Sequence, residues 1–363
     1  MNPNFDLSAL AMKAVCPNNE ILYDDKGLPS VMVRIPKMTY AELGLGESTA
    51  VFPAFIVNGQ EVPEIYISKY QNCVYGNRAY SLPARLPQTS ITFDTAITRC
   101  TSKGSGWHLM TRMEWALLAL WCKKNGTMPK GNNNYGKDVS ETIYSAIPGT
   151  FEQDGKRQKV LTGTGPLTWS HDGTPAGIWD LNGNVYEWVG GMRTVYGELQ
   201  VLANNNAADP SHAQTAASAE WKAISGNTGE LITPNGSGTT EGSVKLRWKN
   251  NNHWEYTTSS ETDGTDTYKG CTFESVAADS TIQDAAKAVL QALAMIKADD
   301  TSGAYLGDYF YANSYEAERS FHCGGNWYSG ANAGVFCAFG SYARSSSSGV
   351  IGFRSAFVKL PTV

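Results

Sequence analysis

Apolar and polar residues alternate in two short segments near the N-terminus. Residues 31–36 (VMVRIP) and 64–70 (EIYISKY) both show the two-residue period of half-buried strands. In residues 91–102, apolar residues recur at helical spacing and predict a helix that ends before Gly104. Residues 1–30 show no clear period, so we expect an irregular lead-in segment there.

The strongest helix signal begins at Thr111. Thr111 and Glu114 form a capping box, in which the hydroxyl accepts from the third amide while the carboxylate reaches back to the first. The following WALLALWCKKNG is apolar on nearly all sides and ends at Gly126, a residue suited to the left-handed turn after a helix. We expect this helix to lie inside the core.

The rest of the pattern predicts loops, an insertion and a glycine-rich end. Residues 126–177 are rich in Gly, Asn and Pro and predict long ordered loops. Residues 195–315 are interpreted as an insertion with a strand at 243–248 (SVKLRW) and a helix at 280–297. Residues 321–358 combine short apolar runs with glycines, which indicates short strands.

Composition excludes several classes of protein. Hydrophobic residues make up 42% of the chain and charged residues 17%, which favours a folded core over disorder. A net charge of −5 without a Lys/Arg cluster argues against a nucleic-acid partner. No apolar run approaches the roughly 18 residues of a membrane span. The N-terminus lacks a basic start followed by an apolar stretch, so we expect no secretory signal. Seven scattered cysteines without a CxxC pair suggest neither a zinc site nor a disulfide framework.

Three tryptophan-containing segments follow one another along the chain. They are GWHLMTRMEWALLA (residues 106–119), GIWDLNGNVYEWV (177–189), and GGNW (324–327) through GFRSAF (352–357). In this order they resemble formylglycine-generating-enzyme-like domains. The resemblance implies an α+β fold: the C-type lectin fold in its formylglycine-generating-enzyme-like variant, loop-rich with few helices and short antiparallel strands. It implies one domain over residues 31–358, apart from the insertion.

The resemblance does not extend to the catalytic cysteines. In the enzymes two cysteines follow the GGS-aromatic stretch, at positions that match Ser329 and Gly334 here. Cys323 and Cys337 lie at other offsets, and thiolate ligation of copper tolerates little change in geometry. The five histidines also lack the HxH or HxxxE spacing expected of the related iron enzymes. We therefore expect a binding protein and not an enzyme, with no required cofactor.

The C-terminal segment GGNWYSGANAGVFCAFGSYARSSSSGVIGFRSAF is similar to the variable region of proteins diversified by retroelements. The similarity includes the short motifs GGNW, AGVF and IGFR. In that family an error-prone reverse transcriptase substitutes bases opposite adenine in a template rich in AAY codons. Such codons can become Tyr, Ser, Phe, Gly or Val but never Lys, Glu, Gln, Met or Trp. None of these last five occurs in residues 328–357.

This second resemblance places the variable region at residues 322–357. Tyrosine and phenylalanine supply rigid contact area and serine and glycine supply adaptable hydrogen bonds, as in antibody paratopes. We expect these side chains to point outward while Trp327 and Phe336 pack inward. Asn332 is either an undiversified template asparagine or a turn former. The predicted ligand-binding residues are Tyr328, Ser329, Asn332, Phe339, Ser341, Tyr342, Ser346, Ser348, Gly349 and Val350.

Residues 180–187 (DLNGNVYE) resemble a calcium-binding loop of the formylglycine-generating enzymes. The match implies calcium ligands from Asp180, from the main-chain carbonyls of Gly183 and Val185, and from the carboxylate of Glu187. Hard oxygen ligands of this kind suit calcium. The alternative is a self-bonded Asx turn with Glu187 paired to an arginine. A structural calcium is thus one of two hypotheses for this loop.

The resemblances together imply a bacteriophage tail protein that recognises a bacterial surface protein or glycan. Residues 1–30 would attach it to tail or baseplate proteins, and tail function implies a homotrimer. One alternative is a lectin-like adhesin on the bacterial cell surface. Because we expect no secretory signal, we favour a protein that is made in the bacterial cytoplasm and carried out on the virion. The second alternative, an oxidase, is disfavoured by Ser329 and Gly334. We expect ligand preference to depend on the variable region and not on the insertion.

Overall fold

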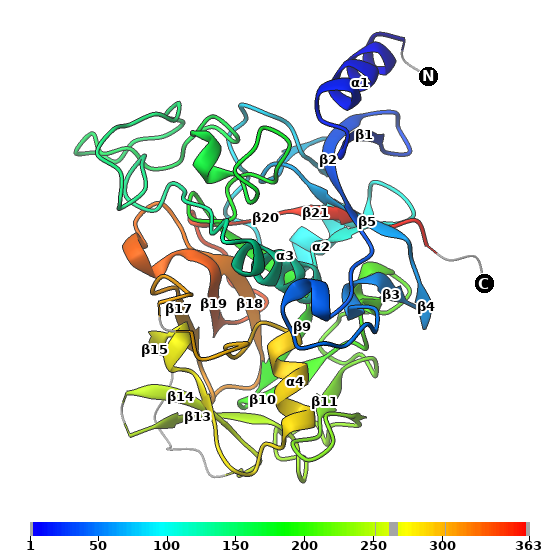
Figure 1. Cartoon of the computed structure of the whole chain (residues 1–363), viewed down its shortest axis with the longest axis vertical. Coiled ribbons are helices and arrows are strands. Elements are labelled where there is room, and N and C mark those ends of the chain that lie inside the picture. The colour runs from blue at the N-terminus through cyan, green and yellow to red at the C-terminus, as the bar shows by residue number, and fades with distance from the viewer. Residues whose placement is uncertain (1–2, 251, 261–267, 302, 361–363) are drawn as a thin grey trace.

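Two sheets form the framework of the fold in the computed structural model, which describes residues 3–250, 252–260, 268–301 and 303–360. The first is antiparallel and has the strand order β1-β2-β5-β21-β8. Its strand β21 comes from the C-terminal end of the chain and lies between strands from the N-terminal part (Figure 1). The strands are β1 (Asn19–Tyr23), β2 (Pro29–Pro36), β5 (Glu64–Ser68), β8 (Trp107–Leu109) and β21 (Ser355–Phe357).

The second sheet has twelve strands and carries the C-terminal segment at its middle. Its main path is β15-β17-β19-β18-β9-β10-β13-β14-β16, with β11 and β12 added beside β10, and β20 beside β9. The strands are β9 (Tyr186–Val195), β10 (Glu198–Val201), β11 (Lys222–Ile224), β12 (Leu231–Ile232), β13 (Lys245–Lys249), β14 (His253–Thr257), β15 (Lys269–Thr272), β16 (Ala277–Ala278), β17 (Tyr309–Ala312), β18 (Arg319–Gly324), β19 (Gly334–Tyr342) and β20 (Ile351–Phe353). Two hairpins stand apart, β3 (Ile56–Val57) with β4 (Gln60–Glu61) and β6 (Cys73–Tyr75) with β7 (Arg78–Tyr80).

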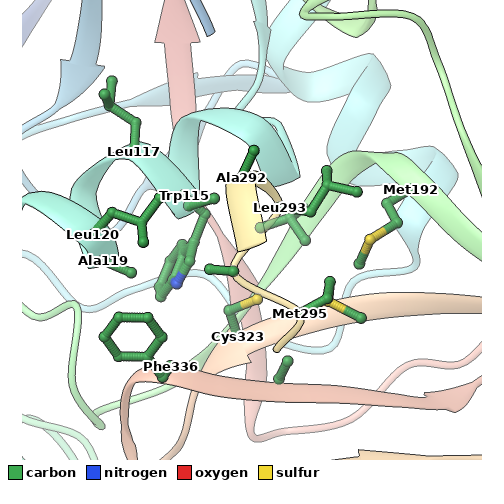
Figure 2. Close-up of a cluster of buried hydrophobic side chains, with 14 of the residues drawn as sticks. Trp115, Leu117, Ala119, Leu120, Met192, Ala292, Leu293, Met295, Cys323 and Phe336 are labelled. Atoms are coloured by element: carbon green, nitrogen blue, oxygen red, sulfur yellow. The ribbon is translucent and has the colours of Figure 1, made fainter. Parts of the chain in front are cut away.

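Helix α3 (Arg112–Asn125) lies at the centre of the molecule, where it contacts β9, β19 and helix α4 (Asp284–Ala292) (Figure 1). The predicted capping box is present: Glu114 N donates to Thr111 Oγ1 (3.1 Å) and Thr111 N donates to Glu114 Oε2 (2.9 Å). Trp115 points toward Phe336 and Cys323 in the main core cluster (Figure 2), and its Nε1 donates to Val335 O (2.7 Å). This helix therefore anchors the strands of the C-terminal segment.

The fold class expected from the sequence is confirmed. In the described ranges, the regular helices besides α3 and α4 are α1 (Pro3–Val15) and α2 (Phe93–Thr101). Residues 126–177 are loops with one 3-10 turn, as predicted. No helix in these ranges is long and apolar enough to cross a membrane. The 3-10 turns are Ala41–Leu43, Pro53–Phe55, Leu167–Trp169, Asn206–Ala208, Phe273–Ser275 and Gly330–Asn332.

The prediction of an irregular lead-in was wrong in its secondary structure. Helix α1 projects from the upper end of the molecule (Figure 1), and strand β1 pairs with β2. Leu7 and Leu10 of α1 are both 67% exposed. Because the two leucines described in this helix face solvent, they show no amphipathic period, and the Leu, Ala, Met and Lys residues of the helix favour it by local propensity.

The predicted helix at 280–297 is shorter in the structure. It ends at Ala292, and Ala294 follows with a left-handed backbone (φ 49°). The carbonyls of Leu293 and Ala294 instead accept from the guanidinium of Arg112, at 2.9 and 2.6 Å. The apolar residues beyond the helix end are buried, which explains why apolar residues in the sequence continue past the end of the helix.

Residues 195–315 continue the second sheet and its core. They supply β10 to β17 and α4, and their side chains Trp254, Tyr256 and Met295 belong to the same hydrophobic cluster as Trp115. The segment therefore shares its core with the rest of the chain. The prediction that it is an insertion stays a prediction.

Candidate functional site

Four adjacent strands of the second sheet present a row of aromatic rings. Tyr311 of β17 pairs with Phe339 of β19, which in turn pairs with His322 of β18. Tyr186 of β9 completes the row, with its ring centroid 4.6 Å from that of His322. The ring of His322 stacks on Phe339 with centroids 4.6 Å apart, and Tyr311 lies 4.9 Å from Phe339 on the other side. We call these four residues the aromatic floor.

A β-bulge brings Tyr342 to the same face as Phe339. The register shifts between the pairs His322–Phe339 and Ser320–Tyr342, so three steps along β19 match two along β18. In a regular strand, residues three apart point to opposite faces, and an added residue restores the same face. The rings of Phe339 and Tyr342 consequently lie 5.1 Å apart, and both contact His322.

Above the aromatic floor lies a hollow of about 200 Å³. Six of the ten residues predicted to bind ligand line it, although they are spread over residues 328–350. We call five of the six, excluding Phe339 of the floor, the rim: Tyr328, Ser329, Asn332, Tyr342 and Val350. The full lining is Tyr186, Tyr268, Tyr311, His322, Asn326, Tyr328, Ser329, Asn332, Phe339, Tyr342, Val350 and Ile351.

Four predicted residues lie outside the lining. Ser341 is buried on β19, and within the described chain its Oγ has no hydrogen-bond partner. Ser346, Ser348 and Gly349 lie in the loop after β19, which main-chain bonds tie to the start of α2, from Phe93 N to Arg344 O (3.1 Å) among others. A side chain added at Gly349 would meet nothing within 4 Å. Of the three loop positions, Gly349 is exposed and Ser346 and Ser348 are partly exposed, and Val350 of the lining follows directly in the chain.

The expectation that all variable side chains point outward was wrong for two residues. Phe339 is 5% exposed and Ser341 is 7% exposed, whereas Tyr328 is 51% exposed. Phe339 is buried because it sits on the central strand of the aromatic floor, between rings from the strands on both sides. Trp327 and Phe336 are buried as expected.

Sequence reasoning missed half of the lining. Tyr186 lies inside the GIWDLNGNVYEWV segment, and Tyr311 lies on an alternating strand, but neither position marks a binding residue by its pattern. Tyr268 and Tyr311 belong to residues 195–315, so that segment contributes to the hollow as well. Only pairing between distant strands brings them to the variable residues.

The lining carries no charge at neutral pH. Among its twelve residues His322 alone could become cationic near neutrality, and burial lowers the pKa of His322 to about 3. Its Nδ1 is buried, without a hydrogen-bond partner in the described structure. Burial also raises the pKa of Tyr311 to about 12 and that of Tyr186 well above the ordinary value. The hollow is thus neutral, aromatic at its floor and polar at its rim.

The 180–187 loop lies deep inside the fold and turns its oxygens toward one atom. Gln71 Nε2 lies within hydrogen-bond distance of the carbonyls of Asp180 (3.1 Å), Gly183 (3.3 Å) and Val185 (3.0 Å) and of Glu187 Oε1 (3.0 Å), and its two hydrogens are shared among these acceptors. Three of these oxygens are the predicted calcium ligands at Gly183, Val185 and Glu187. The point on which they converge is therefore occupied by an amide nitrogen.

Of the two carboxylates in this loop, Glu187 has a cationic partner. Arg354 donates to both oxygens of Glu187, from Nε at 2.9 Å and from Nη2 at 2.8 Å. The Asp180 carboxylate accepts from Gly163 N at Oδ2 (2.9 Å), its Oδ1 is buried without a hydrogen-bond partner in the described structure, and burial raises its pKa to about 6. As arranged here, the Gln71 nitrogen takes the point where a calcium ion would meet the other three predicted ligands. Glu187 instead has the arginine partner of the alternative hypothesis.

The sequence matches the sulfatase-modifying factor enzyme 1-like domain family over residues 46–227, just over half of the chain. The chain belongs to this family. In its C-type lectin-like fold, the chain has Ser329 on the hollow and Gly334 at the start of β19, where the resemblance to the enzymes expects cysteines. Burial raises the pKa of Cys323 to about 11 and that of Cys337 well above the ordinary value, which keeps both thiols protonated and unreactive.

Comparison with solved structures gives remote likenesses only. PvdO from Pseudomonas aeruginosa has 12% identity, with 93% of this chain and 97% of that one covered and a TM-score of 0.35. Treponema denticola variable protein 1 has 10% identity, with 93% of this chain and 98% of that one covered and a TM-score of 0.32. The Major Tropism Determinant P3c variant has 12% identity, with 93% of this chain and 71% of that one covered and a TM-score of 0.29. No curated protein matches the sequence.

Proposed function

We propose that this member of the family is a non-catalytic ligand-binding protein whose residues 322–357 are diversified by a retroelement. The observation that carries the proposal is that six of the ten predicted ligand-binding residues, which lie between the fixed motifs of the variable region, surround one hollow. Neither their place between these motifs nor the codon rule requires such residues to meet in space. A ligand-contacting surface is the place where diversified side chains would be useful.

The backbone under the rim is held by bonds that do not need the rim side chains. Tyr186 N donates to Val350 O (2.9 Å), Gly330 N to Asn133 O (2.8 Å) and Tyr135 N to Trp327 O (2.6 Å). Since main-chain groups are present in every residue type, such bonds persist when the side chain changes. This separation supports a site that can vary while the fold stays fixed.

Binding is favoured over catalysis by the chemistry of the lining. None of its twelve residues is a carboxylate, lysine, arginine or cysteine, and His322 is neutral. A general acid or base needs a pKa near the working pH, and a nucleophile needs an activating base. Aromatic rings with a few amides and hydroxyls are instead typical of ligand pockets.

The flanking DNA provides the first test. We expect a reverse-transcriptase gene beside a near-repeat of the codons for residues 322–357 that differs only opposite adenines. The protein test replaces the five rim residues with those of a sibling variable region, meaning another diversified version of residues 322–357, and measures binding to host cells. Transfer of preference supports the proposal. If preference follows residues 195–315 when the two regions are exchanged separately, the diversified site is not where we place it.

We further propose that the protein is carried on a phage tail and recognises a bacterial surface protein or glycan. Residues 1–30 would attach it to tail or baseplate proteins, and a homotrimer would raise the strength of attachment by binding several receptors together. Immunogold labelling of purified phage tests the location, and the mass of the purified protein tests the trimer. Label on bacterial cells but not on phage would favour the rival, a cell-surface adhesin.

A further inference from the structure

We propose that the hollow binds one uncharged, hydroxyl-bearing six-membered ring: a neutral hexopyranose at the end of a bacterial surface glycan. This rests on the proposed function, because it assigns a ligand class to the same hollow. Three properties of the lining support it, namely its size, its lack of charge and the arrangement of its rings and polar groups.

Size limits the ligand to a single ring. An apolar cavity of about 150 Å³ holds one benzene molecule, and the hollow measures about 200 Å³. The extra space accommodates the hydroxyl groups of a sugar ring. A helix or an extended peptide would need a longer groove than this lining provides.

Charge excludes most alternatives to a neutral ligand. An acidic sugar, a phosphate or an ammonium group would lose its hydration in the hollow without meeting an opposite charge, because the lining has none at neutral pH. An aromatic cage can still attract a quaternary ammonium through its ring faces, so that class of ligand becomes an outcome of the test.

The rings and polar groups match the two parts of a pyranose. The C–H bonds on one face of the sugar carry slight positive charge, which suits the electron-rich faces of Tyr268 and Tyr311, two rings of the lining that are not fully buried. The sugar hydroxyls require partners that both donate and accept, and Asn326, Ser329 and Asn332 provide them at the edge of the hollow. Asn332 Nδ2 already reaches toward the hydroxyl of Tyr311, at 3.5 Å.

Part of the lining lies outside the predicted variable residues. Tyr186, Tyr268 and Tyr311 lie outside residues 322–357, the predicted variable region. Diversification would then leave these rings in place and change the rim. We infer that sibling proteins keep a ring-shaped ligand and differ in which sugar or linkage they prefer.

Calorimetric titration of the full chain tests the ligand class. The probes are methyl glycosides of glucose, galactose and N-acetylglucosamine, with N-acetylneuraminic acid, tetramethylammonium and N-acetyltyrosine amide for comparison. We expect saturable binding of at least one neutral glycoside and at least tenfold weaker binding by Tyr268→Ala. Tyr268 is 55% exposed, so its loss should leave the melting temperature unchanged. Tyr144→Ala, at a tyrosine 50% exposed outside the lining, is the matched control.

Binding of only the charged or aromatic probes overturns the proposal, as does glycoside binding that is unaffected by Tyr268→Ala. The proposed function is judged separately by competition on cells. If rim exchange changes cell binding and no glycoside competes, diversified binding stands and the sugar assignment falls. If a glycoside binds but rim exchange changes nothing on cells, the sugar assignment stands and the diversified site falls.

A second inference has an independent basis in the 180–187 loop. We infer that the Gln71 amide replaces the cation that the resemblance to the enzymes implies. Its nitrogen faces four oxygens within 3.3 Å, and Asn184 Nδ2 fixes the orientation of the amide by donating to Gln71 Oε1 (2.9 Å). A neutral donor suffices there because Arg354 already balances Glu187.

Thermal melting with calcium and with excess chelator tests this replacement. We expect the full chain to melt at the same temperature in both and to hold no stoichiometric calcium by elemental analysis. Gln71→Ala should melt lower with chelator and recover with calcium, because the carbonyls of Asp180, Gly183 and Val185 then lose the amide that faces them. Gln71→Glu, which adds a carboxylate beside Glu187, is a second variant with the same expected response. Gln153→Ala, at an exposed glutamine, is the control.

Two results overturn the inference. One is a chelator-sensitive melting temperature, or bound calcium, in the unaltered chain. The other is a loss of stability in both Gln71 variants that calcium does not restore, since the loop then has no capacity for a cation.

Discussion

The 180–187 loop and the hollow are both built around β9, yet their backbones are held in different ways. In the loop, side chains bind main-chain groups: Gln71 bonds three carbonyls, and Asn184 Oδ1 accepts from Val160 N (2.9 Å). Around the hollow, main-chain groups bind one another and the aromatic side chains contact other rings, although Ser329 Oγ accepts from Asn326 N (3.0 Å). Residue identity should therefore be strict in the loop and less constrained at the rim positions other than Ser329.

The largest loss of stability is expected from Arg354→Met. Arg354 and Glu187 are 0% and 1% exposed, and removing one partner of a buried pair leaves a buried charge without compensation. We expect a loss of about 3–5 kcal/mol in the free energy of unfolding, measured by urea denaturation. Arg354→Met combined with Glu187→Gln should recover part of the loss. If the single variant loses less than about 1 kcal/mol, the loop does not depend on this pair.

Phe339→Ala should cause the next largest loss of stability. Phe339 is the lining residue at which we expect burial to restrict the residue type. The ring is buried and contacts Tyr311, His322 and Tyr342, so truncation should cost about 3 kcal/mol, toward the lower end for buried phenylalanines. Phe339→Tyr keeps the ring and should cost much less. If Phe339→Ala loses no more stability than Phe339→Tyr, the packing of this ring is not what stabilises the aromatic floor.

The pH dependence of stability should differ in sign between the two regions. Burial lowers the pKa of His322 to about 3, so the unfolded chain binds more protons there, and this contribution to stability is lost as pH falls from about 6.5 toward 3. Burial raises the pKa of Asp180 to about 6, so its contribution is lost as pH rises from 3.8 to about 6.

Each group changes the slope of unfolding free energy by at most about 1.4 kcal/mol per pH unit. Between pH 4.5 and 6, His322→Phe should make the slope less positive than in the unaltered chain, and Asp180→Asn should make it more positive. Urea denaturation at several pH values measures both. His171, whose pKa burial lowers to about 4, is present in all three proteins and does not affect the comparison. Slopes that change in the same direction would contradict the assigned pKa shifts.

Local signals predicted the elements that local interactions form. The capping box placed the start of α3 correctly because both of its hydrogen bonds lie within one turn. The apolar spacing of residues 280–297 overran α4 because the bond that ends the helix comes from Arg112, far away in the sequence. Helix α1 has no amphipathic signal in the sequence, since Leu7 and Leu10, where its side chains are described, are both exposed.

The site could be predicted only where a codon rule or a motif marks its residues. The motifs of the variable region located the rim, and the codon rule agreed with its residue types. The bulge that turns Tyr342 toward Phe339 depends on pairing with β18 and has no signal of its own in the sequence. Tyr268 and Tyr311 reach the hollow through pairing between β15, β17 and β19. In the 180–187 loop the motif located the converging oxygens, and only the structure shows Gln71 among them.

The smallest effect on stability is expected from exchange at the exposed variable positions. Tyr328 is 51% exposed, Gly349 has open space around it, and Ser346 lies in the loop held by main-chain bonds. Tyr328→Ser, Ser346→Tyr and Gly349→Asn together should change the free energy of unfolding by no more than about 0.5 kcal/mol, while changing binding to host cells. The matched comparison is Asn184→Ser in the 180–187 loop, a single polar exchange that removes bonds to Val160 and Gln71 and should cost more than all three together. A triple variant that is less stable than Asn184→Ser would mean that the variable side chains help to hold the fold, and the contrast between a strict loop and a free rim would fail.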